Sequence, residues 1–402
     1  MMIKNIDKTC NITTGKLDAN KAVSDGDYPF FTCAKLPDKI DSFAFDDDVV
    51  LVAGNNANGN FHVSRFKGKF NAYQRTYVLT AKKGEDIDYV YYSLKLELKR
   101  LRERSQGSQT KFLTMPILSS IVINDIEYSD QVAISSILSR IDKKIELNNR
   151  INKQLEAIAK LIYDYWFVQF DFPDENGKPY KSSGGKMVFN EVLKREIPDA
   201  WNDISLDNII VKSGTGLNPR SNFKLGEGDN YFITIKNIKN GKINFDDKTD
   251  RISDESLEII NKRSDLQIGD VLFTSIDPVG NTYFIQEKPK NWNINESVFT
   301  LRADEKLLTP EFLLILLSSK EMKVFTKQSS TGSIHKGIRH EVLKDFKLPY
   351  GGMPVILSFT KILRPLLERQ YMLDTETQKI NKLRDWLLPM LMNGQVTVSE
   401  AS

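Results

Sequence analysis

Two loops of the sequence gather hydrogen-bond donors and positive charge around a glycine. The first loop spans 105–111 (SQGSQTK) and follows the basic run KRLRER at 99–104. The second spans 327–336 (KQSSTGSIHK). Small donors beside a glycine can approach phosphates closely, and Lys and Arg supply neutralising charge. The loops therefore predict nucleic-acid contacts, made by Ser108, Gln109, Thr110, Lys111, Ser333, His335, Lys336 and Arg339.

A turn and a strand in the first third of the chain carry polar side chains of a second kind. Amides, an imidazole and a guanidinium there could form hydrogen bonds with base edges. The predicted base-reading residues are Asn60, His62, Asn71, Tyr73, Gln74 and Arg75. Lys16, Arg220 and Asn281 complete the predicted DNA-binding set. A single polar loop is usually just solvated, so it is the occurrence of similar loops in both halves that favours binding.

Motifs for catalysis or for a cofactor are incomplete. No Gly-Lys pair is followed by the Ser or Thr that a phosphate-binding P-loop needs. Residues 214–216 (GTG) lack the third glycine of a dinucleotide fingerprint and are better explained as a turn. Residues 218–220 (NPR) lack the second proline and the aromatic residue of the DNA amino-methyltransferase motif. Neither Pro173-Asp174 nor Pro198-Asp199 is closely followed by an acidic-x-Lys triplet, which a nuclease would need.

Histidine and cysteine usage argues against a metal site or a disulfide framework. The 3 histidines are scattered, and the spacing of His335 and His340 suits neither face of a helix for metal binding. The 2 cysteines, Cys10 and Cys33, do not form a CxxC motif. We therefore expect no catalytic residue, no metal and no cofactor in this chain.

Composition is that of an ordinary globular protein. The chain has 402 residues, enough for two or three domains, and a formal net charge of +3. Nucleic-acid binding would therefore rest on local patches rather than on a global basic field. The first residues lack an apolar signal core, and no apolar run is long enough to span a membrane. The expected compartment is the cytoplasm.

A long amphipathic helix must position these loops. In residues 131–167 apolar side chains recur at three- and four-residue steps, with one polar interruption, and polar residues fill the other faces. At ~1.5 Å per residue this helix would extend roughly 55 Å and would need a partner. The expected stripe is Ile134, Ile137, Ile141, Ile145, Ile151, Leu155, Ile158 and Ile162.

The partner is a second copy of the stripe, 222 positions further on. Six apolar positions recur there, as Ile356, Phe359, Leu363, Leu367, Leu373 and Ile380, and the polar Asn148 falls on the polar Gln370. Any two amphipathic helices can be slid into apparent register, but the flanking regions repeat as well. We expect a second helix near 353–393, with a kink or a late start at Pro365.

The globular regions before each helix also match. Thr14-Gly15 resembles Ser213-Gly214, and the run at 48–51 (DVVL) resembles 270–273 (DVLF). Further matches join 59–60 to 280–281, 71–79 to 295–301, and 107–111 to 332–336. The offset grows between the first and second match, which predicts an insertion within 222–265.

These observations predict an α+β fold made of two mixed α/β units, related by a pseudo-twofold and joined by two long antiparallel coiled-coil helices. The expected segments are a first unit (1–129), a first helix (130–170), a linker or arm (171–196), a second unit (197–352) and a second helix (353–395). The arm is rich in Gly, Ser and Pro.

Three motifs resemble the specificity subunit of Type I restriction–modification enzymes. Residues 144–173 (KIELNNRINKQLEAIAKLIYDYWFVQFDFP) look like its central conserved region, 175–201 like its linker, and 383–396 (LRDWLLPMLMNGQV) like its C-terminal signature. The resemblance covers the whole chain. Ala200 departs from it, because the family often has glycine there.

The resemblance implies a non-catalytic subunit whose two target recognition domains each read half of a bipartite, asymmetric DNA site. The paired helices would set the spacing and dock two modification subunits, which carry the adenine methyltransferase site. Restriction subunits with motor and nuclease activity would join the complex. S-adenosylmethionine, ATP and magnesium would belong to these partners. The alternative is a self-contained methyltransferase or nuclease with its own reader, and a scaffold that does not bind DNA is a third possibility.

Overall fold

The computed structural model describes residues 2–55, 61–104, 112–331 and 336–398. The chain forms two compact units. Unit 1 contains Met1–Arg150 and Leu373–Ser402, and unit 2 contains Ile151–Met372. The boundary falls inside both long helices, so each helix belongs partly to each unit.

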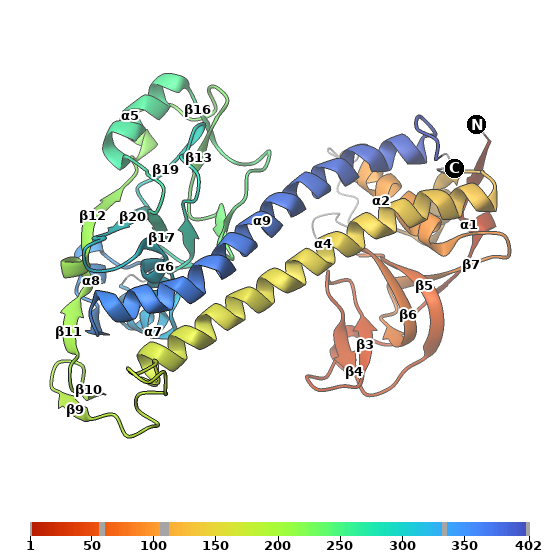
Figure 1. The fold of residues 1–402 in the computed structure, drawn as a ribbon. Helices are drawn as coiled ribbons and strands as arrows, with labels where there is room; N and C mark the ends of the chain where they lie inside the picture. Colours follow the sequence, from red (N-terminus) through yellow and green to blue (C-terminus); the bar gives the residue numbers. More distant parts are fainter. Residues whose placement is uncertain (1, 56–60, 105–111, 332–335, 399–402) are drawn as a thin grey trace. The chain divides into compact units, whose positions relative to one another are not determined.

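Unit 1 is built on a six-stranded sheet with the order β2-β7-β5-β6-β3-β4 (Figure 1). All neighbouring strands in it are antiparallel except β3 and β6, which are parallel. These strands are β2 (Cys10–Thr14), β3 (Tyr28–Phe31), β4 (Asp38–Ile40), β5 (Phe45–Ala53), β6 (Val63–Ala72) and β7 (Thr76–Ala81). The remaining elements are β1 (Ile3–Asn5), β8 (Val122–Asn124), α1 (Ile6–Thr9), η1 (Ala19–Lys21), α2 (Ile87–Arg104) and α3 (Met115–Ser119).

The central strand β5 is buried on both faces. Val50 and Val52 face α2 and the long helices, whereas Val49 and Leu51 pack with Phe70 on the opposite face. Successive side chains of a strand point to opposite faces, so a strand covered on both sides shows a continuous apolar run instead of an alternating one. Such a run contains no clue to which residue faces which side.

Unit 2 contains a four-stranded sheet, β12-β20-β17-β18, and a three-stranded sheet, β16-β13-β19. These strands are β12 (Ile210–Thr215), β13 (Asn230–Ile233), β16 (Arg251–Ile252), β17 (Val271–Thr274), β18 (Thr282–Phe284), β19 (Trp292–Ile294) and β20 (Val298–Ala303). Smaller pairs are β9 (Met187–Asn190) with β10 (Arg195–Pro198), β11 (Asn202–Ser205) with β21 (Lys347–Tyr350), and β14 (Ile238–Lys239) with β15 (Lys242–Ile243). The helices are α5 (Asp254–Ser264), α6 (Pro310–Ser318), α7 (Lys320–Ser329) and α8 (His340–Lys344), and the 3-10 turns are η3 (Leu206–Ile209) and η4 (Pro219–Ser221).

Strand pairing corrects the register of the repeat. Val50 pairs with Leu79 in unit 1, and Val271 pairs with Leu301 in unit 2. Val271 therefore corresponds to Val50, one residue away from the match expected from sequence. The expected register was wrong because β5 is apolar on both faces, and a one-residue slip exchanges those faces.

The same comparison places the insertion of unit 2. Phe31 of β3 pairs with Ala72 of β6 in a parallel strand pair of unit 1. Ile233 of β13 pairs with Ile294 of β19 in the same way in unit 2. The extra residues therefore lie after Ile233 and before β17, where β14, β15, β16 and α5 occur. Helix α5 is capped by Ser253, whose side chain accepts a hydrogen bond from the Ser256 amide, and is followed by Asp265 in the left-handed conformation.

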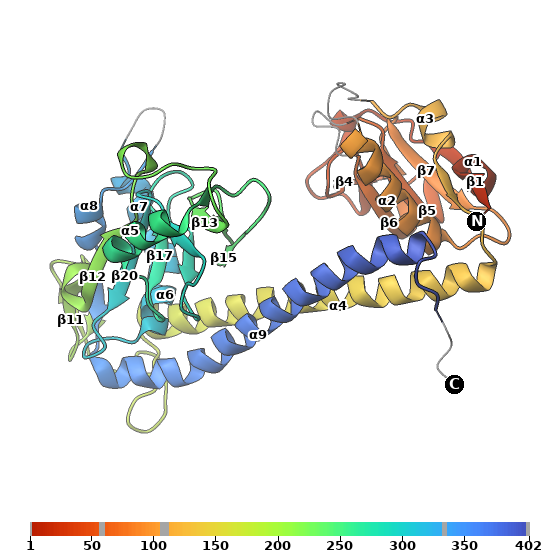
Figure 2. The same cartoon turned by 90° about the horizontal axis from the view of Figure 1, so that it is seen from above.

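The two long helices are α4 (Tyr128–Tyr163), which continues into a π-helical turn, η2 (Asp164–Val168), and α9 (Met353–Met392). Within each unit they lie side by side and antiparallel (Figures 1 and 2). In unit 1, Arg384 forms an ion pair with Asp142 at 3.1 Å, and the Asn148 side-chain nitrogen donates to the Glu376 carboxylate at 2.8 Å. In unit 2, the Gln370 side chain donates to the Asn152 carbonyl at 3.1 Å.

The seam of α4 differs from the expected stripe beyond Asn148. Ile158, expected in the seam, is 44% exposed, whereas Asn152 and Ala159 are buried. The buried series keeps a heptad-like spacing through the polar positions, as Ile134, Leu138, Asn148, Asn152, Ala159, Tyr163 and Trp166. The expected stripe was wrong there because it treated Asn148 as an interruption, although polar residues are part of the seam.

Two further expectations change. Helix α9 is continuous from Met353 through Pro365, so a late start is wrong; the buried neighbours Leu363 and Leu367 hold this part of the helix against the core. The arm is folded rather than extended, because the Phe172 ring stacks on Tyr180 and on Trp201, both at 4.9 Å. Among the described residues, no helix combines the length and apolar character that crossing a membrane requires.

Candidate nucleic-acid interface

A tight turn between β6 and β7 carries the most exposed of the predicted base-reading residues. The Thr76 amide donates to the Tyr73 carbonyl at 2.8 Å, which closes the turn. Gln74 and Arg75 occupy its two central positions and are exposed, and Tyr73 is half-buried. The side chains at the tip are therefore available to a ligand while the backbone is fixed.

Four backbone hydrogen bonds from three neighbouring segments hold this turn. The Tyr73 backbone amide donates to the Phe31 carbonyl at 3.0 Å, and the Gln74 backbone amide donates to the Leu17 carbonyl at 2.9 Å. The Arg75 carbonyl accepts from Gly54 at 2.8 Å, and the Thr76 carbonyl accepts from Gly15 at 3.2 Å. These bonds satisfy the polar groups of the turn and fix its orientation.

Gly15 allows the close approach of two backbones. A Cβ atom at this position would lie 1.9 Å from the Ala72 carbonyl oxygen, which no side chain could tolerate without a shift of the strand. The neighbouring Lys16 is exposed beside the turn. Its ammonium group is suited to a phosphate rather than to a base.

The two tip residues each contact an orienting side chain that the sequence did not indicate. The Gln74 amide nitrogen donates to the Asp18 carboxylate at 2.7 Å. The Arg75 guanidinium lies over the ring of Phe112, 5.9 Å from its centroid, and Phe112 is 52% exposed. Only tertiary structure brings these pairs together, because Asp18 and Phe112 are distant in sequence from the turn.

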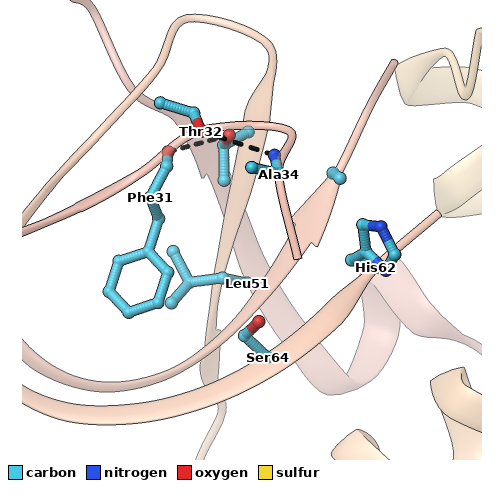
Figure 3. Close-up of a pocket in the computed structure, with 8 residues that line it drawn as sticks. Phe31, Thr32, Ala34, Leu51, His62 and Ser64 are labelled. Carbon is cyan, nitrogen blue, oxygen red and sulfur yellow. Dashed lines mark hydrogen bonds between the residues drawn. The ribbon is translucent and has the colours of Figure 1, made fainter. Parts of the chain in front are cut away.

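A small pocket lies on the sheet next to the turn (Figure 3). It is lined by Phe31, Thr32, Ala34, Leu51, Ala53, His62, Ser64 and Thr76. His62 is half-buried, and burial, together with the charge of Lys35, holds the pKa of its imidazole below the ordinary value. His62 is therefore neutral near pH 7 and offers one donor and one acceptor.

Asn71 has a structural position instead. Its side chain is only 4% exposed. Its nitrogen donates to the Ser42 carbonyl at 3.3 Å, and its oxygen accepts from the Ala72 amide at 3.0 Å. In unit 2 Asn293 accepts from the next amide in the same way, at 2.7 Å. We do not retain Asn71 as a base-reading residue.

Unit 2 builds an equivalent turn, and three of its backbone hydrogen bonds match those of the unit 1 turn. The Val298 backbone amide donates to the Asn295 carbonyl at 3.3 Å, and the Asn295 backbone amide donates to the Ile233 carbonyl at 2.9 Å. The Ser297 carbonyl accepts from Ser275 at 3.0 Å, as Arg75 accepts from Gly54. The turn at 295–298 therefore corresponds to the turn at 73–76.

The equivalent of Gly15 is Gly216, not Gly214. A Cβ at Gly216 would lie 1.7 Å from the Ile294 carbonyl oxygen, whereas Gly214 has its nearest neighbour at 3.9 Å. Similarly, the His62 carbonyl accepts from Ala53 as the Asn281 carbonyl accepts from Thr274, both at 2.9 Å. The expected matches of these two segments were therefore displaced by two residues.

The other predicted residues of unit 2 lie on separate elements. Arg220 is exposed in η4, and Lys336 and Arg339 are exposed before α8. Asn281 is half-buried, and its side-chain nitrogen donates to the Ile238 carbonyl at 3.2 Å. The predicted residues Asn60, Ser108, Gln109, Thr110, Lys111, Ser333 and His335 lie outside the described residues.

The described part of the chain contains no group of three or more His, Cys, Asp or Glu side chains able to hold a metal. Ser213 contacts His340, whose ring lies 4.7 Å from that of Phe299. Burial holds the pKa of His340 below its ordinary value. This pair packs a neutral histidine against an aromatic ring.

Comparison with known proteins gives the same division into two repeated regions. A family model described as "Type I restriction modification DNA specificity domain" matches residues 1–157 and again 198–354. Together these matches cover more than half of the chain. The chain belongs to this family, and the expected resemblance is confirmed.

Individual relatives have the same description. The EcoDI specificity subunit of Escherichia coli is 32% identical over 213 residues, which is 49% of this chain and 46% of that protein. The MjaIX specificity subunit of Methanocaldococcus jannaschii is 23% identical over 337 residues, covering 79% of this chain and 71% of that protein. The match to the E. coli relative thus spans less than half of its length.

A solved structure shows the same fold. The S subunit of a Type I restriction–modification system from M. genitalium superimposes with a TM-score of 0.62 at 17% identity, covering 97% of this chain and 96% of that one. The expectation of two repeated mixed α/β units with long helices is confirmed by this likeness and by the double family match.

Proposed function

We propose that this chain is the DNA sequence-specificity subunit of a Type I restriction–modification complex and recognises a bipartite, asymmetric target. Each unit reads one half-site through its turn and the side chains around it. The observation that carries the proposal is the repeated turn framework. Both units hold a two-residue tip by three equivalent backbone hydrogen bonds, yet the tips present different side chains. Two readers with different tips produce two different half-sites.

Within each unit the exposed side chains divide into two roles. Lys16, Arg220, Lys336 and Arg339 bind phosphates and set the position on the duplex. Arg75 reads a base edge, with guanine as its preferred partner, and Gln74, Tyr73 and His62 complete the reading surface of unit 1. The loops at 105–111 and 332–335 remain predicted phosphate contacts.

The proposed role also requires partners. Two modification subunits dock on the long helices, and restriction subunits join through them. Large apolar side chains exposed on α4 and α9 support docking. In unit 1 these include Tyr128, Val132, Leu147, Leu383 and Trp386, and in unit 2 they include Ile158, Leu161, Leu357, Ile362 and Met372. S-adenosylmethionine, ATP and magnesium bind to the partner subunits.

Co-expression tests the proposal. The full chain is expressed with a modification subunit from the same system in a host that lacks adenine methylation, and methylated positions are mapped by long-read sequencing. We expect one motif with two half-sites and a fixed gap, and no methylation from the chain alone. Methylation by the chain alone, or an uninterrupted motif, would contradict the proposal and favour the self-contained enzyme.

A further inference from the structure

One side-chain pair beside the reading turn occurs in both units, with its hydrogen-bond donor and acceptor exchanged. Asp18 immediately precedes the 3-10 turn η1, and Asn218 immediately precedes η4. Asp18 follows Gly15 closely, as Asn218 follows Gly216, so both residues occupy the same place beside the reading turn. We call each of these residues the cap.

Each cap contacts the first tip residue of its turn. In unit 1 the Gln74 nitrogen donates to the Asp18 carboxylate at 2.7 Å. In unit 2 the Asn218 nitrogen donates to the Glu296 carboxylate at 2.8 Å. Gln74 and Glu296 both follow the residue whose carbonyl closes the turn, so they are equivalent. The donor lies on the tip in unit 1 and on the cap in unit 2.

The reversal changes what each tip residue can offer a ligand. Asp18 occupies one N–H of Gln74 and leaves the other N–H and the carbonyl oxygen. That pair matches the N7 and N6 edge of adenine. Glu296 can only accept, and its oxygen Oε2 is buried with no hydrogen-bond partner among the described residues. An unsatisfied carboxylate oxygen is unfavourable, so a donor from a ligand would stabilise it.

We propose that the cap–tip pair determines one base in each half-site, with Gln74 reading adenine and Glu296 reading cytosine through its N4 amino group. Asp18 and Asn218 are positioning residues that hold the tip side chain through one of its polar atoms. This inference rests on the proposed function. Because Oε2 of Glu296 is covered in the free protein, its carboxylate turns outward on binding, and side-chain changes of this kind are common at interfaces.

The reversal suggests an exchange experiment with nearly isosteric changes. The double variant Asp18→Asn with Gln74→Glu transfers the unit 2 chemistry to unit 1. The double variant Asn218→Asp with Glu296→Gln does the opposite. Each keeps one donor and one acceptor across the pair, so the unfolding midpoint should stay close to that of the parent chain.

The readout is the methylated motif of the complex with its modification subunit, together with binding to a randomised duplex library. The first double variant should change one position of one half-site from adenine to cytosine, and the other half-site should not change. The second should change one position of the other half-site from cytosine to adenine. We expect a change in preference of roughly tenfold or more, since a good base contact discriminates to about this extent.

Single variants supply the matched controls. Gln74→Glu alone sets two carboxylates against each other, so binding should weaken for all sequences and recover in the double variant. Gln74→Ala removes the reading group without repulsion, so it should relax one position while the rest of the motif remains. This variant keeps the proposal testable if an exchange variant does not fold.

The outcomes separate the inference from the function on which it rests. A folded exchange variant with an unchanged motif, or with a uniform loss of binding at all sequences, would show that the pair only stabilises the contact between the two loops. The inference would then be wrong while the specificity function stood. A parent chain that produces no bipartite motif with its partner would instead refute the function.

Discussion

In unit 1 the turn at 73–76 presents Gln74 and Arg75, whereas in unit 2 the turn at 295–298 presents Glu296 and Ser297. Three backbone hydrogen bonds hold both turns in the same way, and a glycine approaches each strand too closely for any side chain. The difference teaches that the framework and the reading residues are separable. A constant scaffold holds a variable tip.

A second difference lies on the other side of the same framework. Unit 2 inserts β14, β15, β16 and α5 between the strands that correspond to β3 and β5. The helix packs Leu257 and Ile260 with Phe232 in a small core of their own. The single helix α2 of unit 1 corresponds to the two helices α6 and α7 of unit 2. In unit 2 the helix is divided at Ser319, which caps α7. Three backbone hydrogen bonds of the turn are the same in both units despite these changes.

Exchange of a whole unit should have the largest effect. Replacing residues 1–129 with the corresponding unit of a relative should change one complete half of the methylated motif and leave the other half intact. The physical reason is that, among the described residues, the hydrogen-bond partners given for each turn lie in its own unit. Long-read methylation mapping measures the result, and a change in both halves would show that the units are not independent readers.

Lengthening the helices should alter the gap between half-sites. Four residues added after Lys153 in α4 and four after Arg369 in α9 lengthen each helix by roughly 6 Å and rotate the residues beyond each insertion by about one full turn. The gap should grow by one or two base pairs at ~3.4 Å each, with unchanged half-sites. An unchanged gap in a well-folded variant would mean that the partner subunits set the spacing.

Two-residue insertions at the same places are the matched control. They rotate the residues beyond each insertion by about 200°, which turns the apolar seam away from the partner helix. This variant should unfold at lower denaturant concentration than the four-residue variant, as measured by circular dichroism.

A single methyl group should disrupt one unit only. Gly216→Ala places a Cβ 1.7 Å from the Ile294 carbonyl oxygen, so the turn of unit 2 must shift. We expect a loss of about 1–3 kcal/mol in the free energy of unfolding and weaker recognition of one half-site. Gly214→Ala, with its nearest neighbour at 3.9 Å, is the control and should behave like the parent chain. Equal effects of both changes would contradict the assignment of Gly216 as the equivalent of Gly15.

The smallest expected effects concern phosphate contacts. Lys16→Ala and Lys336→Ala should each weaken binding to all sequences equally and lower the salt slope by about one. A salt titration of duplex binding measures this, with Arg75→Ala as the contrasting variant that relaxes one position. An unchanged slope would remove that lysine from the interface.

Much of this architecture could be predicted from sequence because it depends on local periodicity. The spacing of apolar residues is sufficient to predict α4 and α9, and Ile134, Ile356 and Leu363 are buried as expected. The existence of the repeat and the family were also predictable, because they rest on motifs that can be read along the chain. The exposed positions of Gln74 and Arg75 in a turn agree with the sequence pattern, and their base contacts stay a prediction.

Only tertiary structure decided how the strands align and which side chains meet. Strand β5 is buried on both faces, so its sequence does not specify its register. In the helix seam, polar residues such as Asn152 and a small residue such as Ala159 take positions that hydrophobicity alone would assign to Ile158. The cap–tip contacts join residues 56 and 78 positions apart. Contacts at such separations depend on the folding of intervening segments, and no local pattern in the sequence encodes them.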